Sequence, residues 1–99
     1  MRELFHPDIN QLILSTILNA LGDPIRLNII KNLANNYETT CACCNASLSK
    51  SVLSHHFKVL RTSGLIKVRI EGKQRFLSIR YDDLEERFPG LLSAIIKSI

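Results

Sequence analysis

The 99-residue sequence lacks several features that define large classes of protein. It has no tryptophan, no apolar span long enough to cross a bilayer, and nothing near its start that resembles a signal peptide. It contains no phosphate-binding loop, metal-hydrolase spacing or nucleophile elbow, which argues against an enzyme. It also lacks low-complexity runs, and its hydrophobic fraction of 45% is typical of a folded chain. We therefore expect a single cytoplasmic domain that is not an enzyme and does not bind membranes.

Cysteine is scarce, and its three copies lie together at Cys41, Cys43 and Cys44. An odd number fits no disulfide framework, and cytoplasmic thiols are expected to be reduced. Three hypotheses stay open for them: structural or incidental thiols, a site for a soft metal or metalloid ion, and reversible oxidation. On a regular helix Cys43 points away from the face that Cys41 and Cys44 share, so three thiols converge on one ion only if the helix is distorted.

Acidic residues are absent from the segment SKSVLSHHFKVLRTSGL, Ser49 to Leu65. Ser49 is a suitable helix N-cap, and Gly64 followed by an apolar residue is typical of a helix C-cap. At helical spacing one flank is apolar and the other carries hydroxyls, an imidazole and cations. The apolar flank consists of Val52, Leu53, Phe57, Val59 and Leu60. The polar flank consists of Ser51, Ser54, His55, Lys58 and Arg61.

This polar flank predicts a helix that enters the major groove of DNA, where short donors reach base edges and cations reach phosphates or guanine. The alternative is an ordinary surface helix whose polar side is only solvated. His56 lies toward the apolar flank, so we expect it to be packed and hydrogen-bonded rather than a DNA contact or metal ligand. His6 precedes the first predicted helix and is expected to be incidental.

A basic segment follows, IKVRIEGKQRFLSIR. This segment predicts a two-stranded hairpin, because apolar and charged residues alternate from Ile66 to Ile70, Gly72 marks a turn, and a β-favouring run follows from Arg75 to Ile79. The tip and outer face of the hairpin carry Arg69, Lys73 and Arg75. From Lys50 to Arg80 there are eight Lys or Arg and one acid, which gives this stretch a charge of +7. Because the whole chain has a net charge of +4, the remaining residues together carry −3. Such concentrated positive charge favours a polyanionic partner. A helix followed by a basic hairpin is typical of a winged helix on DNA.

Four further helices are expected around this unit. The first runs from Pro7 or Asp8 to about Leu21, the second from Asp23-Pro24 to about Ala34, and a weakly coded third covers 39–46. The last covers about 82–98 and is broken at Pro89-Gly90, with Pro89 opening its second part. Two strongly apolar terminal helices exceed what one winged helix needs, so we expect a dimer that presents two recognition helices to a palindromic site. The alternative is that both complete a monomer core.

The stretch LGDPIRLNIIKNLA, followed by SKSVLSHHFKVLRTSGLIKVRIEGKQRFLSI, resembles the ArsR family of bacterial winged-helix repressors over roughly Leu14 to Ile79. The resemblance implies a mainly α, homodimeric winged helix-turn-helix with a small β-hairpin, which represses transcription until a signal releases it from its operator. Residues 1–99 would form one domain, with the helix-turn-helix at about 39–64, the wing at about 66–80 and dimerisation helices at about 8–21 and 82–98. A winged helix that binds proteins instead of DNA is the alternative.

The resemblance also assigns roles by position. The base-reading residues would be Lys50, Ser51, Ser54 and His55. The backbone contacts would be Lys58, Arg69, Lys73 and Arg75, and Arg61 is a further candidate on the same polar flank. Family members that sense arsenite carry C-x-C-x-x-C where this chain has C-x-C-C. The family's other metal site uses Asp and His on the last helix, and here no histidine accompanies the acids Asp82, Asp83, Glu85 and Glu86.

Overall fold

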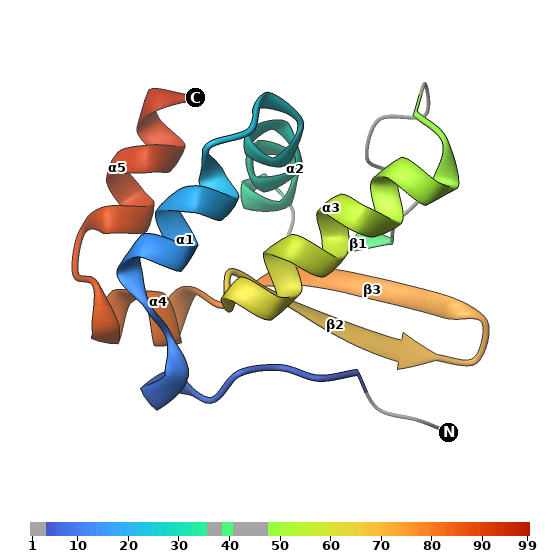
Figure 1. Ribbon diagram of the computed structural model, residues 1–99, viewed down its shortest axis with the longest axis horizontal. Helices are drawn as coiled ribbons and strands as arrows, with labels where there is room; N and C mark the ends of the chain where they lie inside the picture. The colour runs from blue at the N-terminus through green and yellow to red at the C-terminus, as the bar shows by residue number, and fades with distance from the viewer. Residues whose placement is uncertain (1–3, 36–38, 41–47) are drawn as a thin grey trace.

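The structure is a computed structural model that describes residues 4–35, 39–40 and 48–99. A short 3₁₀ helix precedes five α-helices and three strands in the described part of the chain. In chain order the elements are η1 (Ile9–Gln11), α1 (Leu14–Leu21), α2 (Pro24–Ala34), β1 (Thr39–Thr40), α3 (Lys50–Ser63), β2 (Ile66–Glu71), β3 (Gln74–Ile79), α4 (Tyr81–Arg87) and α5 (Leu91–Ser98). Figure 1 shows the β2–β3 hairpin projecting beyond the helices, with α1, α4 and α5 at the opposite end. This arrangement confirms the mainly α fold with a β-hairpin.

Helix α3 begins and ends where its sequence predicts. The Ser49 hydroxyl oxygen accepts a hydrogen bond from the Val52 amide at 3.2 Å, which satisfies one of the free donors of the first turn. Gly64 ends the helix with φ +94°, a left-handed conformation that favours glycine. The Leu65 amide then donates to the Leu60 carbonyl at 3.1 Å, as expected for a glycine C-cap with an apolar residue behind it.

The predicted first helix is wrong in one respect, because it consists of two pieces. Leu12 and Ile13 are extended, with ψ of 129° and 125°, and they separate η1 from α1. The Leu12 side chain is 2% exposed and packs so closely over Gly64 that a Cβ there would lie 2.0 Å from Leu12 Cδ2. Burial of this leucine against the end of α3 therefore overrides continuous helix formation in the N-terminal segment.

The sheet has one more strand than the predicted hairpin. Strands β2 and β3 are antiparallel from the pair Ile66 and Ile79 to the pair Glu71 and Gln74. The third strand, β1, pairs with the other edge of β3, which gives the order β1-β3-β2. The helix predicted from 39 is thus wrong at Thr39–Thr40, where β-branched side chains favour extended backbone. Residues 41–46 of that prediction lie outside the described residues.

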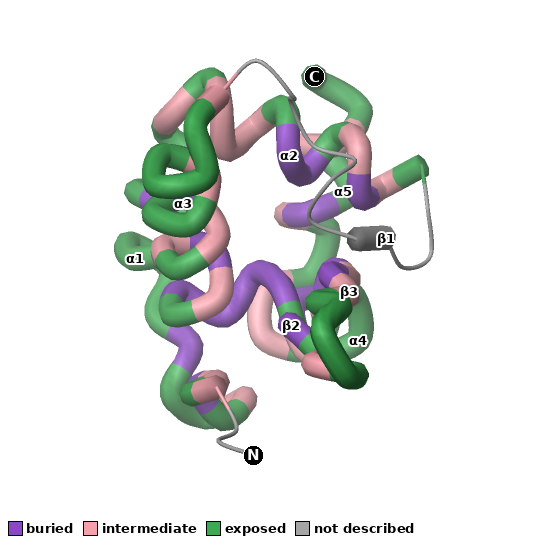
Figure 2. Tube along the Cα trace, turned by 90° about the vertical axis from the view of Figure 1, so that its right-hand side faces the viewer, coloured by how far each residue is buried: buried purple, intermediate pink, exposed green. Residues whose placement is uncertain are grey.

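The core joins one face of the sheet to α1, α2 and α3. Ile17, Ile29, Leu60 and Leu77 are fully buried, one from each of these elements. Figure 2 shows buried positions gathered at α2 and where α3 passes into β2, whereas much of α3 is exposed. Within the predicted apolar flank of α3, Val52 departs from expectation because it is 40% exposed. The packed part of this helix is therefore its later turns.

The C-terminal segment is broken as expected, although not at the predicted residue. Helix α4 begins at Tyr81, and the chain leaves helical geometry at Phe88. Gly90 has φ +81° and precedes α5, which begins at Leu91 rather than at Pro89. The reversal between the two helices thus uses a left-handed glycine. Among the described residues, no helix combines the length and apolar character needed to span a membrane.

Candidate nucleic-acid interface

The polar flank of α3 forms an exposed surface. Lys50, Ser51, Ser54, His55 and Lys58 are all exposed, and they recur at three- and four-residue steps along the helix. Among these side chains are two hydroxyls and an imidazole that can donate to base edges, and cations that can bind phosphates. The first turn of α3 contains no acid, so nothing on this helix opposes the approach of a polyanion.

His56 is packed and hydrogen-bonded, which confirms its prediction. It is 8% exposed, and its Nδ1 lies 3.2 Å from Nη1 of Arg26 on α2. Arg26 also donates from Nε to the Ala20 carbonyl of α1 at 2.6 Å. Since a guanidinium only donates, Nδ1 must accept, and the proton of neutral His56 belongs on Nε2. One arginine thereby joins α1, α2 and α3.

Arg26 is placed by the N-cap of its own helix. Asp23 accepts hydrogen bonds from the backbone amides of Arg26 and Ile25 at 3.1 and 2.8 Å, and proline follows it at the first helical position. The hydrogen bond from the Arg26 amide is the main cause that holds the pKa of Asp23 below its ordinary value. The Ile25 amide and the charge of Arg26 lower this pKa further, and desolvation opposes them. The sequence Asp-Pro-Ile-Arg thus begins α2 and aims Arg26 at its two partners.

The wing carries its cations on two faces. Arg69 lies opposite Phe76 in the strand register, and its guanidinium carbon lies 4.5 Å from the centroid of the Phe76 ring. Arg69 also forms an ion pair with Glu71. Arg75 pairs instead with Ile70, on the face that continues into the core. Lys73 lies at the exposed turn. Arg69 therefore lies on the outer face and Lys73 at the tip, and Arg75 is exposed in a strand pair near the turn, on the face opposite Arg69.

Arg61 faces the N-terminal segment. Its Nη1 donates to the Phe5 carbonyl at 2.5 Å, and Arg61 is the one residue of the predicted DNA surface that is half-buried. His6 lies nearby, and its Nε2 accepts a hydrogen bond from the Val68 amide of β2 at 3.0 Å. The expectation that His6 is incidental is therefore wrong. These two contacts join residues 56 and 62 positions apart, so local sequence patterns could not reveal them.

Comparison with known proteins assigns this chain to a family. The family described as bacterial regulatory protein, arsR family, matches residues 23–68. The HTH-type transcriptional regulator YceK of Bacillus subtilis is 34% identical over 84 residues, which cover 80% of this chain and 82% of that protein. The chain belongs to the ArsR family. The arsenical resistance operon repressor of Staphylococcus xylosus is 35% identical over 75 residues, which cover 73% of this chain and 70% of that protein.

The winged-helix fold of this ArsR-family chain is shared with solved regulators. HlyU from Vibrio cholerae matches with a TM-score of 0.70 at 24% identity, and the match covers 85% of this chain and 88% of that one. ArsR-family proteins are DNA-binding regulators of transcription, and repressors are among the relatives of this chain. This membership confirms the predicted DNA-binding function and favours it over a winged helix that binds only proteins.

The ArsR-family chain has no metal-ligand cluster within the described ranges 4–35, 39–40 and 48–99. Cys41, Cys43 and Cys44 lie outside these ranges, so their three hypotheses stay predictions. One similar protein is named as an arsenical resistance operon repressor.

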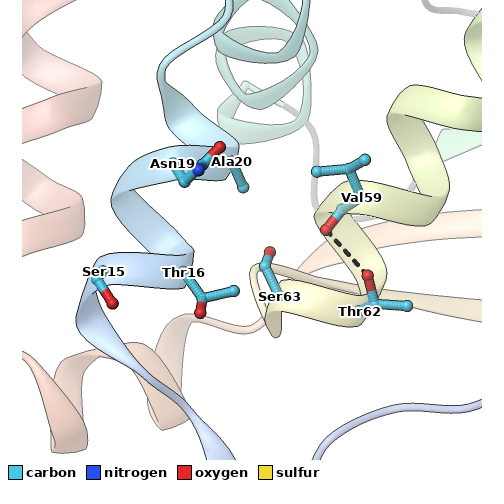
Figure 3. A pocket seen from close by; sticks show the side chains of 7 residues that line it. All are labelled: Ser15, Thr16, Asn19, Ala20, Val59, Thr62 and Ser63. Atoms are coloured by element: carbon cyan, nitrogen blue, oxygen red, sulfur yellow. Dashed lines mark hydrogen bonds between the residues drawn. The ribbon is translucent and has the colours of Figure 1, made fainter.

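A pocket of about 330 Å³ lies between α1 and the last turns of α3 (Figure 3). The Thr62 and Ser63 hydroxyls there donate to carbonyls of their own helix, at 2.8 Å to Lys58 and 2.9 Å to Leu60. Its lining is uncharged and consists of Ser15, Thr16, Asn19, Ala20, Val59, Thr62 and Ser63. It contains no titratable side chain and so offers no group for acid or base chemistry.

Proposed function

We propose that this chain is a homodimeric repressor that binds a palindromic operator with α3 in the major groove and the β2–β3 wing along the adjacent backbone. The observation that carries the proposal is the uninterrupted exposed flank of α3, which combines hydroxyls, an imidazole and lysines without any acid. A winged helix presents its recognition helix in this manner. Because such a protein works on chromosomal DNA, a cytoplasmic location accompanies the proposal, and no catalytic activity is needed.

The residues of this surface divide into two roles. Ser51, Ser54 and His55 have short side chains that reach only as far as base edges, so they would read sequence together with Lys50. The longer cations Lys58, Lys73 and Arg75 are exposed and would bind phosphates. Arg69 would do so after release from Glu71, and Arg61 through the part of its guanidinium that does not hold the Phe5 carbonyl.

Dimerisation is supported by an apolar strip on α1 and the residue before it. Ile13, Leu14 and Leu18 are 59%, 44% and 47% exposed, although a small soluble domain gains stability by burying such side chains. The strip lies at the end of the molecule opposite the wing tip (Figure 1), where a second copy would leave both wings accessible. Leu18→Glu should therefore give a monomer in analytical ultracentrifugation, and a dimer that persists would contradict the proposed interface.

Fluorescence anisotropy on the DNA upstream of the chain's own gene tests the DNA surface. Affinity should fall steeply with salt, with a slope that corresponds to about 6 to 10 phosphate contacts per dimer. Ser54→Ala should cost about 1 to 3 kcal/mol on the preferred site and little on unrelated DNA. Lys73→Gln should weaken binding to all sequences and reduce the slope.

Lys97→Gln is the matched control, because it removes the same charge from α5 at the end opposite the wing. Equal effects of Lys73→Gln and Lys97→Gln would show that only total charge matters and would contradict the proposed wing contact. Affinity that is independent of salt would instead favour the protein-binding alternative.

We further propose that a soft metal or metalloid ion bound by the cysteines is the first signal to test. The support is the similarity to an arsenical resistance repressor and the thiol-rich C-x-C-C segment just before α3. Arsenite should release the reduced protein from DNA, a dithiol should restore binding, and Cys41→Ser or Cys44→Ser should abolish the response. A complex that also persists with zinc and a mild oxidant would show that thiols do not read the signal.

A further inference from the structure

The N-terminal arm, residues 4–8, is held against both DNA-binding elements by polar contacts. Arg61 in the last turn of α3 donates to the Phe5 carbonyl, and the Val68 amide of β2 donates to His6 Nε2. Arg80, between β3 and α4, donates to the Pro7 carbonyl at 2.8 Å. Figure 1 shows the arm passing along β2 toward η1. The arm therefore connects the recognition helix, the wing and the C-terminal helices.

The arm also packs on the junction between α3 and the wing. Pro7 is buried, and its Cγ would lie 3.5 Å from a Cβ at Gly64. Leu4 packs against the core from the other end of the arm. A displacement of the arm thus removes contacts from the residue that connects the recognition helix to β2.

His6 is the one titratable group of this arm whose protonation changes a bond to the wing. Strand β2 is at the edge of the sheet, so the Val68 amide that faces away from β3 has His6 Nε2 as its acceptor. A protonated imidazole has no lone pair at Nε2 and cannot accept this bond. The charged groups facing His6 are Arg61 on α3, Lys67 on β2 and Arg80 before α4, and all three are cationic.

Burial is the largest cause that lowers the pKa of His6 below its ordinary 6.5, and the hydrogen bond to the Leu4 backbone opposes it in part. The three cations contribute further lowering. Between the lowered pKa and 6.5 the folded chain therefore binds fewer protons than the unfolded chain. Stability from the docked arm is complete above this window and decreases as the pH falls through it.

We propose that His6 is a positioning residue for DNA binding: its neutral imidazole docks the N-terminal arm on β2, and its protonation releases the arm from the wing and weakens the operator complex. The effect on DNA rests on the interface proposed above. The docking itself does not, because it is a property of the free protein.

The first experiment follows the Val68 amide by NMR without DNA, at pH values from 5 to 8, while the His6 ring is titrated in the same samples. The protection factor of the Val68 amide should fall as His6 protonates. His6→Gln, which keeps an acceptor and cannot be protonated in this range, should retain protection throughout. Unchanged protection of Val68 in the wild type across the His6 titration would overturn the proposal, whether or not the variant folds.

The second experiment compares operator affinity of the wild type and His6→Gln. The two proteins should bind about equally at pH 7.5. At a pH below the midpoint of the His6 titration measured in the first experiment, the wild type should bind about fivefold more weakly, the factor that corresponds to one neutral hydrogen bond. Both proteins keep His55 and His56, so the ratio isolates His6. A ratio that does not change with pH would overturn the coupling to DNA. Failure of both proteins to bind at pH 7.5 would instead contradict the proposed function, while the Val68 result would still decide the docking.

Discussion

Gly64→Ala tests how the N-terminal segment packs on the recognition helix. At φ +94° an alanine pays a left-handed backbone cost of about 1 kcal/mol. Its Cβ would also lie 2.0 Å from Leu12 Cδ2, so the leucine must move out of a buried position. Overpacking of this kind costs about 1 to 3 kcal/mol. We therefore expect Gly64→Ala to lower the free energy of unfolding by about 2 to 4 kcal/mol.

Gly72→Ala is the matched control, because Gly72 also has positive φ, +61°, but nothing lies within 4 Å of a Cβ built there. The free energy of unfolding of this variant should fall only by the backbone cost of about 1 kcal/mol. Both should be measured by urea unfolding followed by far-UV circular dichroism, at one protein concentration because a dimer's apparent stability depends on it. Equal losses from the two substitutions would refute the argument that Leu12 packs on Gly64.

A double-mutant cycle sharpens the test. Leu12→Ala alone should cost about 2 to 5 kcal/mol, since Leu12 is fully buried. In the Gly64→Ala background, Leu12→Ala also removes the methyl group that the new Cβ would meet. There it should lower the free energy of unfolding by less than it does in the wild type. The expected coupling is about 0.5 to 3 kcal/mol, and additive losses would place the two side chains out of contact.

Two further predictions concern polar contacts. Arg26→Gln should lower the free energy of unfolding by about 2 to 4 kcal/mol in the same assay, because it weakens bonds to an α1 carbonyl and to His56; the exposed Arg75→Gln is the control, and losses of similar size in both would contradict the role of Arg26. Glu71→Gln should strengthen DNA binding several-fold at low salt by removing a negative charge beside Arg69 on the wing, with a gain that shrinks at high salt. Glu86→Gln on α4 changes charge equally and should have little effect, so equal gains would refute a specific role for the ion pair.

Features that depend on neighbours in sequence were predictable. The N-cap at Ser49, the C-cap at Gly64 and the alternation of the hairpin are each encoded within a few residues. The packing of His56 was also predictable, because its position on the helix places it beside the apolar flank. Periodicity did not reveal its partner, Arg26, because that contact spans 30 residues.

The errors share a physical origin in tertiary contacts. The apolar run of the first segment favours one helix, but burial of Leu12 against Gly64 imposes extended backbone within it. Likewise Thr39–Thr40 become a strand because β3 offers an unpaired edge there. His6 gained a role through the edge of β2, which exists only after the wing has formed. In each case a partner distant in sequence decided the local conformation.

Contacts within the fold also change how many of the cations counted in the sequence can meet DNA. Among the eight cations from Lys50 to Arg80, Arg61 and Arg80 donate to backbone carbonyls of the N-terminal arm, and Arg69 is paired with Glu71. The five that remain have no ion pair within the described part of the chain, and they are Lys50, Lys58, Lys67, Lys73 and Arg75. A guanidinium suits the first role because it offers several donors in a fixed geometry, whereas four of the five others are lysines, which act as point charges on phosphate. A dimer would thus present about ten such cations, which alone would give a slope of about −9 for the logarithm of DNA affinity against the logarithm of salt concentration. A steeper slope would show that arginines of this stretch also reach phosphates. If the arm left β2 in the same complex, the proposal that the docked arm supports operator binding would be contradicted.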